Sequence, residues 1–363
     1  MRIGAERLAA DPSLVEGARI GLVTNHAGVL PDLTSTPSAL LEAGVPLAAL
    51  FGPEHGLRGA AQAAEGEADG VDPATGLPVF DAYGRDPGEA LARAGVDTLL
   101  IDLPDVGARF YTYIWTMHDF LRAASRQGVQ VVVLDRPNPL GGLVCEGPLL
   151  DPAYVSPVGK APIPIRHGLT VGELALGFDP SARVIEMEGW RREMLFPDTG
   201  LIWVMPSVNM PSFDTALVYP GTGLFEGTNF SEGRGTTRPF ELVGAPYVDE
   251  RFAPALGALD LPGVRFREAW FRPTFHKHAG TLVRGVQVHV LDPRSFQPVL
   301  TGVSMLHVAR TLYPEQFAWW GPERFEQHLW GSGTLTEGLR DPRELCPEPA
   351  HPVGHLLYPS SRR

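Results

Sequence analysis

Short apolar runs alternate with short amphipathic segments over the first 135 residues of the chain. Strands are expected where apolar residues run together, and helices where apolar positions recur about every 3.6 residues. The expected strands are 20–24, 46–51, 98–102 and 129–134, and the expected helices are 38–43, 87–94 and 113–127. This alternation is typical of a parallel, doubly wound sheet. The sequence therefore predicts an α/β domain at the N-terminus.

The second half of the chain has a less regular pattern. Thr170 and Glu173 form a capping box, in which two side chains bond backbone N–H groups at the start of a helix. Further strands are expected at 184–187, 201–205, 264–266 and 285–290, and helices at 303–312 and 323–329. Strands and helices no longer alternate here, which is typical of an α+β unit. We expect a doubly wound domain at 1–220 and a smaller α+β domain at 221–363 that closes a cleft.

Polar residues follow each of the first four expected strands. The carboxyl ends of parallel strands meet at one edge of the sheet, where open α/β sheets bind ligands. These residues are Asn25 and His26, Glu54 and His55, Asp102 and Asp105, and Asp135 and Asn138. Loops are polar in most proteins, but four such strand ends favour a shared ligand cleft.

The segment 51–59 carries the strongest single signal. Glu54, His55 and Arg58 lie within five positions, between glycines that let the backbone approach a ligand closely. General acid–base catalysis needs a carboxyl group in a controlled environment, and Glu54 is the best candidate for that role. The alternative is a glutamate on the surface or at a helix cap.

Two further groups of residues could bind a ligand. Arg109 can pair with a carboxylate, and Tyr111 can stack on a sugar ring. The alternative is that this segment packs into the core at the start of the helix expected at 113–127. The segment 221–238 is rich in glycine and threonine, which suits a loop around a polyhydroxylated or acidic ligand, or else a flexible surface loop. The polar candidates in and before this segment are Asn209, Glu226, Asn229, Glu232 and Arg234.

A metal site is a weaker hypothesis. His26, His55 and His167 could bind a metal together with Asp102 or Asp105. They show no ligand spacing such as His-x-x-x-His, so hydrogen bonds to a polar ligand or to backbone are the better explanation. We expect no metal and no cofactor.

Composition and missing motifs narrow the function further. The formal net charge of −12 argues against a nucleic-acid partner. Neither a Gly-x-Gly-x-x-Gly after the first strand nor a Gly-x-x-x-x-Gly-Lys-Ser/Thr is present. We therefore expect no dinucleotide or nucleoside triphosphate site in the Rossmann-like domain. No Gly-x-Ser-x-Gly elbow of a serine hydrolase is found, and the many carboxylates favour glycoside cleavage instead.

The location in the cell is expected to be the cytoplasm. The first residues, MRIGAER, lack the apolar core of a signal peptide, and no apolar run reaches the length of a membrane helix. Two cysteines far apart imply no disulfide framework. No membrane partner is expected.

Five segments together resemble the exo-β-N-acetylmuramidase (NamZ-like) family, bacterial glycoside hydrolases formerly described as a domain of unknown function. They are FGPEHG (51–56), DVGARFYTY (105–113), LDRPNP (134–139), PIRHGLT (164–170) and EGTNFSEGRGT (226–236). The resemblance implies an exo-acting enzyme that releases β-1,4-linked N-acetylmuramic acid from non-reducing ends of peptidoglycan fragments. Its partner would be a small muropeptide or disaccharide, bound between a Rossmann-like domain and a smaller C-terminal domain.

The resemblance also implies roles for residues. The glutamate that matches Glu54 would be the catalytic acid, expected to be partly buried, and a charged His55 or Arg58 beside it would oppose its protonation. Asp105, Glu226 and Glu232 compete for the second carboxylate, with Glu232 slightly ahead. N-acetylmuramic acid carries a lactyl carboxylate, for which the candidate arginines are Arg58, Arg109 and Arg234.

Two other functions stay open at this point. One is a metal-dependent hydrolase or deacetylase of cell-wall sugars that uses His55, Asp102 and Asp105. The other is a non-catalytic protein that binds muropeptides. The stereochemical course is open as well, because the 2-acetamido group of the substrate could replace a carboxylate as nucleophile.

Overall fold

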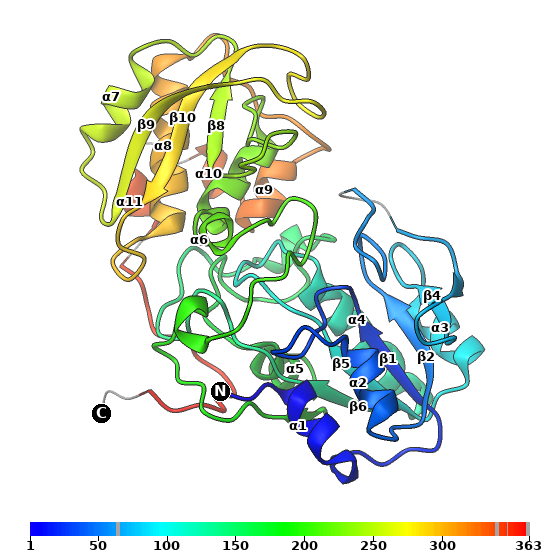
Figure 1. The fold of residues 1–363 in the computed structure, drawn as a ribbon. Coiled ribbons are helices and arrows are strands. Elements are labelled where there is room, and N and C mark those ends of the chain that lie inside the picture. The colour runs from blue at the N-terminus through cyan, green and yellow to red at the C-terminus, as the bar shows by residue number, and fades with distance from the viewer. Residues whose placement is uncertain (63–65, 338–340, 347, 361–363) are drawn as a thin grey trace.

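The computed structural model describes residues 1–62, 66–337, 341–346 and 348–360, which form two lobes (Figure 1). The large lobe is built on a seven-stranded sheet and the small lobe on a three-stranded sheet. The strands of the large sheet are β1 (Ile20–Thr24), β2 (Leu47–Gly52), β3 (Gly70–Val71), β4 (Pro78–Asp81), β5 (Thr98–Asp102), β6 (Gln130–Leu134) and β7 (Arg183–Ile185). The helices of this lobe are α1 (Gly4–Ala10), α2 (Thr36–Glu42), α3 (Pro87–Ala94), α4 (Tyr113–Gln127) and α5 (Val171–Phe178).

The large sheet confirms the expected α/β fold. Its spatial order is β3-β4-β2-β1-β5-β6-β7, and every neighbouring pair is parallel except β3 with β4. The chain places β2, β3 and β4 on one side of β1, and then β5, β6 and β7 on the other side. Ligands bind at such a switch point, beyond the carboxyl ends of the strands. This edge of the sheet faces the small lobe.

Burial explains why the strands of this sheet were recognisable. Every residue of β1 and β5 is buried, as expected of parallel strands with helices on both faces. The helices α3 and α4 end at Gly95 and Gly128, whose left-handed backbone conformation closes a helix at little cost for glycine. The capping box of Thr170 and Glu173 is present at the start of α5.

The small lobe combines an antiparallel sheet with packed helices. Its strands are β8 (Leu242–Ala245), β9 (Val264–Phe271) and β10 (Val283–Val290), in the order β8-β10-β9. Its helices are α6 (Phe213–Thr222), α7 (Phe252–Gly257), α8 (Pro298–Leu312), α9 (Phe325–Trp330), α10 (Thr334–Glu337) and α11 (Pro342–Leu345). The helices α6 and α8 approach each other closely at two glycines. A Cβ atom on Gly302 would lie only 2.3 Å from the carbonyl oxygen of Gly221, so no larger residue fits there.

One expected strand is wrong. Residues 201–205 form no strand, and their side chains Ile202 and Met205 are exposed. The carbonyl oxygen of Met205 accepts a hydrogen bond from Nε2 of His26 at 2.6 Å. This carbonyl group is therefore bonded to a side chain and not to the backbone of a neighbouring strand. The segment 221–238 also differs from a flexible surface loop. It continues α6 into a 3-10 helix, Gly223–Gly227, and most of its residues up to Glu232 are buried.

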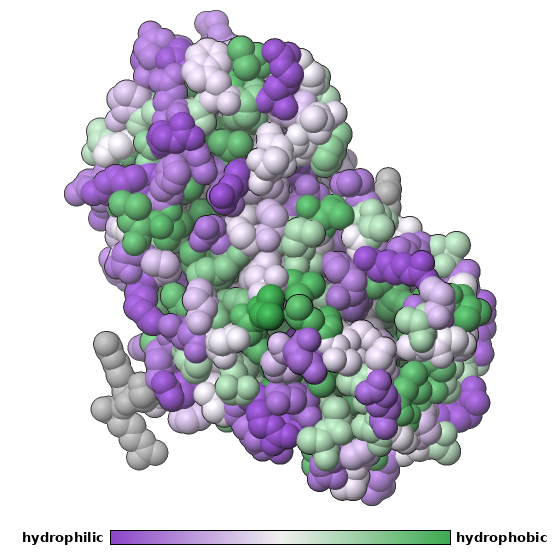
Figure 2. Space-filling view, viewed as in Figure 1, coloured by the Kyte–Doolittle hydropathy of each residue, from purple (hydrophilic) through white to green (hydrophobic). Residues whose placement is uncertain are grey.

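One apolar core extends through both lobes. Phe110 of the large lobe packs edge-on against Tyr219 of α6, with ring centroids 5.0 Å apart, and Tyr219 packs against Phe240 at 4.6 Å. On the face shown in Figure 2, hydrophilic and hydrophobic residues are interspersed over both lobes. Among the described residues, none of the helices combines the length and apolar character needed to span a membrane.

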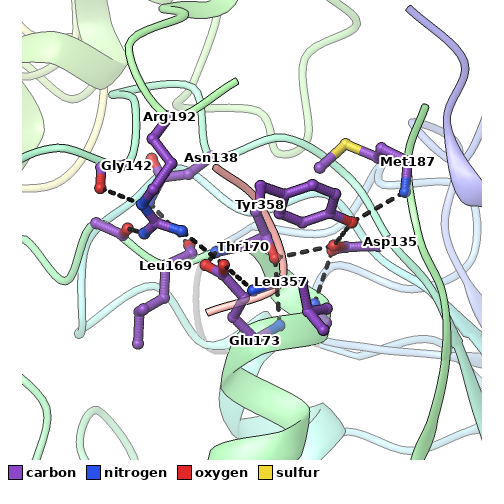
Figure 3. Close-up of polar contacts among 12 residues, drawn as sticks. Asp135, Asn138, Gly142, Leu169, Thr170, Glu173, Met187, Arg192, Leu357 and Tyr358 are labelled. Carbon is purple, nitrogen blue, oxygen red and sulfur yellow. Dashed lines mark hydrogen bonds and ion pairs between the residues drawn. The ribbon is translucent and has the colours of Figure 1, made fainter. Parts of the chain in front are cut away.

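The C-terminal segment returns to the large lobe and joins a buried polar network (Figure 3). The hydroxyl of Tyr358 donates to Asp135, which follows β6, and accepts the backbone N–H of Met187 at 2.9 Å. Glu173 accepts the N–H of Leu357 at 2.9 Å and pairs with Arg192 at 2.6 Å. Burial raises the pKa of Asp135 to about 7. These contacts hold Leu357 and Tyr358 beside the end of β6 and the start of α5.

Candidate active site

A cleft of about 600 Å³ lies between the two lobes. The large lobe contributes residues that follow β2 and β4 or precede and begin α4, and the small lobe contributes residues of α6 and the segment after it. The polar and charged residues that line it are Glu54, His55, Tyr83, Arg85, Tyr111, Thr112, Thr116, Asp119, Lys160, Ser207, Asn209, Tyr219, Glu226 and Arg234. The cleft therefore gathers both signs of charge and several aromatic hydroxyl groups.

Glu54 lies two residues beyond β2, with only 7% of its surface exposed. The chain reverses directly after it, because His55 and Gly56 both adopt positive φ angles, 73° and 78°. The Glu54 carboxylate accepts a hydrogen bond from Oγ1 of Thr112, the residue before α4, at 2.5 Å. Burial first, and then the charge of Glu54, raise the pKa of Tyr83, which also lines the cleft. Glu54 is thus a buried, oriented carboxylate in a cleft.

The two ionisable neighbours of Glu54 in the sequence have partners of their own, although His55 also lines the cleft. Nδ1 of His55 donates to the carbonyl oxygens of Ala61 and Gln62, at 3.0 and 3.1 Å. The Arg58 side chain is 59% exposed and lies 3.9 Å from Asp72. Arg58 is therefore not among the residues that line the cleft.

A cluster of charged residues forms the wall contributed by the small lobe. Arg234 joins two carboxylates, with Nη2 3.1 Å from Glu226 and Nε 3.3 Å from Glu232. Glu232 also lies 2.9 Å from Nζ of Lys277 and 3.3 Å from Nδ1 of His276. Glu226 and Arg234 line the cleft, whereas Glu232 is completely buried beneath it.

The cations of this cluster fix the charge of Glu232. Burial alone would raise its pKa, but His276, Lys277 and Arg234 lower the pKa of Glu232 to about 2. Burial likewise opposes the charge of Arg234, yet Glu226 and Glu232 raise its pKa above the ordinary value. Both groups stay ionised, so the carboxylate of Glu232 anchors the arginine from below.

Asp105, Asn138 and His167 lie together near the ends of β5 and β6, away from the lining of the main cleft. Oδ2 of Asp105 accepts the N–H of Gly107 at 2.8 Å and lies 3.1 Å from Nε2 of His167. Asn138 donates to the carbonyl oxygen of Leu169 at 3.0 Å. Asp105 borders a smaller cavity of about 60 Å³ at the switch point of the sheet.

The Arg109 side chain is fully buried, and its described hydrogen bonds all go to backbone carbonyl oxygens. Its partners, at 2.6 to 3.1 Å, are Pro148 and Ile163 of the large lobe and Leu329 and Trp330 of the small lobe. Burial lowers the pKa of Arg109 to about 9. This arginine joins the two lobes behind the cleft.

Three other expected ligand residues hold loops together. Asn25 donates to the hydroxyl of Tyr113 at 3.0 Å and to the carbonyl oxygen of Pro206 at 3.1 Å. His26 contacts the carbonyl oxygen of Met205, as described above, and burial lowers its pKa. Asn229 donates to the carbonyl oxygen of Gln316 at 2.7 Å. Of the remaining expected residues, Tyr111 and Asn209 line the cleft.

The residues of the metal hypothesis have other partners. Asp102 receives two N–H groups from Arg136, at 2.5 and 2.9 Å, while His55 and Asp105 make the separate contacts given above. Within the part of the chain that the structure describes, no three or more His, Cys, Asp or Glu side chains converge on a point where a metal could bind. The geometry gives the metal-dependent hypothesis no support.

Several residues of the cleft were missed in the sequence. Thr112 lies inside the segment 105–113, and its position just before an expected helix was the available signal. Tyr219 comes from α6, a helix that the hydrophobic pattern did not predict. Lys160 pairs with Asp119 across the cleft lining, and no sequence pattern joins two residues 41 positions apart.

Comparisons with known proteins agree over nearly the whole chain. The sequence matches the family described as exo-β-N-acetylmuramidase NamZ, its N-terminal part over residues 20–214 and its C-terminal part over 217–345. The peptidoglycan β-N-acetylmuramidase NamZ of Bacillus subtilis (strain 168) is 49% identical over 331 residues, which cover 88% of this chain and 80% of that protein.

Two solved structures of DUF1343 family proteins from Bacteroides fragilis have the same fold. One is 36% identical with a TM-score of 0.83, and the other is 30% identical with a TM-score of 0.74. Each comparison covers 93% of this chain and 90% of the other chain. The similarity therefore includes both lobes.

Proposed function

The chain belongs to the exo-β-N-acetylmuramidase NamZ family, and on this premise we propose that the cleft between its lobes is the active site. The protein is a glycosidase that releases β-1,4-linked N-acetylmuramic acid from the non-reducing ends of peptidoglycan fragments. The observation that supports this site best is that Glu54 from one lobe and Glu226 and Arg234 from the other line the same cleft. A division into domains at residue 220 and a location in the cytoplasm stay predictions.

Glu54 is proposed as the general acid. Its carboxyl group would donate a proton to the glycosidic oxygen while the bond from that oxygen to the anomeric carbon breaks. Thr112 donates a hydrogen bond to this carboxyl group and so helps to orient it in the cleft. Because Glu54 is 7% exposed, bulk water has little access to compete for that proton.

Glu226 is proposed as the second carboxylate of the cleft. It lines the cleft, whereas Glu232 is buried below and Asp105 borders the smaller cavity. Its negative charge would stabilise the positive charge that develops at the anomeric carbon, or orient the 2-acetamido group of the sugar. Glu232 then supports catalysis from beneath the cleft by fixing Arg234.

Arg234 is proposed to bind the lactyl carboxylate. Of the three arginines considered from the sequence, it is the one among the lining residues of the cleft. Its guanidinium is held by two carboxylates and lies 5.0 Å from the ring centre of Phe240. A guanidinium fixed in this way is suited to planar, bidentate recognition of a carboxylate.

The direct test uses two disaccharides that differ in the order of their sugars. The purified protein is expected to hydrolyse N-acetylmuramyl-β-1,4-N-acetylglucosamine and to leave N-acetylglucosaminyl-β-1,4-N-acetylmuramic acid intact. Mass spectrometry of the products would show free N-acetylmuramic acid only in the first case. Binding without hydrolysis would instead indicate a muropeptide-binding protein, and release of acetate would indicate a deacetylase.

Replacing Arg234 should selectively impair muramyl substrates. A charge-assisted hydrogen bond contributes about 1.5–3 kcal/mol, so R234M should lower kcat/KM for an aryl N-acetylmuramide about 10- to 100-fold. An activated aryl N-acetylglucosaminide, which lacks the lactyl group, is expected to be hydrolysed slowly by the wild type, and R234M should lower this slow turnover much less. R234K keeps the charge without the planar guanidinium group, so its kcat/KM for the muramide should lie between those of R234M and the wild type.

Arg238 provides the matched control for this experiment. It lies four residues further along, is 48% exposed and pairs with Glu241 at 3.1 Å. R238M should keep both activities near those of the wild type. An equal loss of muramide and glucosaminide turnover in R234M would contradict a role in binding the lactyl carboxylate.

A further inference from the structure

Trp320 stands out among the residues beside the cleft because it is held in place and yet 48% exposed. Its backbone N–H donates to the carbonyl oxygen of Gly227 at 2.8 Å, directly after Glu226. Two residues further on, Pro322 lines the cleft, as does Phe325 at the start of α9. Trp320 therefore follows the backbone beside the proposed second carboxylate and lies two residues before the cleft lining.

The indole ring is oriented by residues of the charged cluster. Nζ of Lys277 lies 4.9 Å from the ring centroid, and the ring of His276 stands edge-on to it at 5.6 Å. Lys277 is itself buried, and its Nζ donates to the carbonyl oxygens of Phe225 and Glu226 at 2.8 and 3.1 Å. The ring thus keeps a fixed position relative to Glu226 without being covered.

A half-exposed tryptophan that is already oriented has the properties of a sugar-binding platform. One face of a pyranose ring presents C–H groups, which pack favourably on an indole ring, and a fixed ring loses little entropy on binding. An exo-acting enzyme encloses the terminal sugar, so the rest of the fragment must leave the cleft through its mouth. The next sugar of the chain is the group that would meet Trp320 there.

We propose that Trp320 forms the subsite for the sugar on the leaving side of the bond, the pyranose to which N-acetylmuramic acid is attached. This inference rests on the proposed function and adds a binding site to it. Trp320 is then a specificity-determining residue for the aglycone. It favours a fragment in which a second pyranose follows the terminal sugar over muramyl glycosides with a small leaving group.

The test compares a ligand that reaches Trp320 with one that does not. N-acetylmuramyl-β-1,4-N-acetylglucosamine fills both positions, whereas free N-acetylmuramic acid, used as a competitive inhibitor, fills only the pocket of the cleaved sugar. W320A should raise KM for the disaccharide about 3- to 10-fold, the effect of losing one ring contact. The inhibition constant of free N-acetylmuramic acid should stay within about twofold of the wild-type value, because the pocket itself is unchanged.

Two further variants make the experiment decisive. W320F keeps an aromatic ring and should restore most of the affinity for the disaccharide. Trp270, on β9 of the small sheet, is 56% exposed and serves as the matched control, so W270A should behave like the wild type. Melting temperatures would verify that each variant is folded, and W320Q offers a polar replacement if W320A is not.

The outcomes separate this inference from the proposed function. If the wild-type protein hydrolyses the disaccharide while W320A and W320Q keep its KM, the subsite is overturned and the glycosidase activity stands. A parallel rise in KM and in the inhibition constant would also overturn the subsite, because the ring would then support the whole cleft. If the wild-type protein hydrolyses no muramyl disaccharide, the proposed function itself fails.

Discussion

Replacing Glu54 by glutamine is expected to lower kcat for a muramyl disaccharide about 10²- to 10⁴-fold, the usual contribution of a general acid. Glutamine has nearly the same shape and can still accept the hydrogen bond from Thr112, so E54Q should fold and melt like the wild type. KM should change little, because the amide occupies the same wall of the cleft. Product release measured by chromatography gives both constants.

The leaving group decides whether Glu54 acts as an acid. A 2,4-dinitrophenolate leaves without protonation, so E54Q should hydrolyse a dinitrophenyl muramide with a much smaller loss than the disaccharide. Glu188, a half-exposed residue paired with Arg2 on the surface of the large lobe, provides the control variant E188Q. Near wild-type turnover of the disaccharide by E54Q would remove Glu54 from the mechanism, and equal losses on both substrates would indicate a role other than proton donation.

The parallel sheet was predictable because its strands are buried on both faces. The runs at β1 and β5 coincide with the observed strands, and the helices α3 and α4 have the expected bounds. Burial on both faces makes a strand continuously apolar, which a short sequence window detects. The strand β4, which has four residues, was missed. The helix α6 was also missed, because it is buried on nearly all sides and lacks an amphipathic pattern.

The site was only partly predictable, for a different reason. A buried polar side chain must find a hydrogen-bonding partner, but the sequence does not reveal whether that partner is a ligand or the backbone. Arg109, Asn25 and Asn229 are buried or partly buried beside functional segments, and their described bonds go to the backbone or to a tyrosine hydroxyl. Glu54 and Arg234 come from similar segments and line the cleft. Only the three-dimensional arrangement separates these two groups.

The charged cluster of the small lobe shows the same limitation. The sequence singled out Glu232 for its position beside a glycine, two residues before Arg234. Its other partners, His276 and Lys277, lie on the loop between β9 and β10, far along the chain from Glu232. This network makes Glu232 a permanently ionised support for Arg234, a role that follows from its burial and its partners.

Replacing Glu232 by glutamine is expected to lower the free energy of unfolding by about 3–5 kcal/mol at pH 7, the usual effect of breaking a buried ion pair. The neutral amide of the E232Q variant would leave the charges of Lys277 and Arg234 buried with less compensation. Urea unfolding followed by circular dichroism gives the difference between variant and wild type. Glu268, exposed on β9 and paired with Arg284, provides the control, and E268Q should unfold close to the wild type.

The pH dependence of that difference identifies the charge as the cause. The pKa of Glu232 falls from an ordinary 4.5 to about 2 in the folded state, so the folded protein binds fewer protons than the unfolded chain between these values. Stability from this carboxylate is therefore fully present above the unfolded-state pKa of 4.5 and is lost as the pH falls toward 2. The difference between wild type and E232Q should shrink over this range. A difference that stays constant or grows on acidification would show that packing at Glu232, and not its charge, stabilises the small lobe.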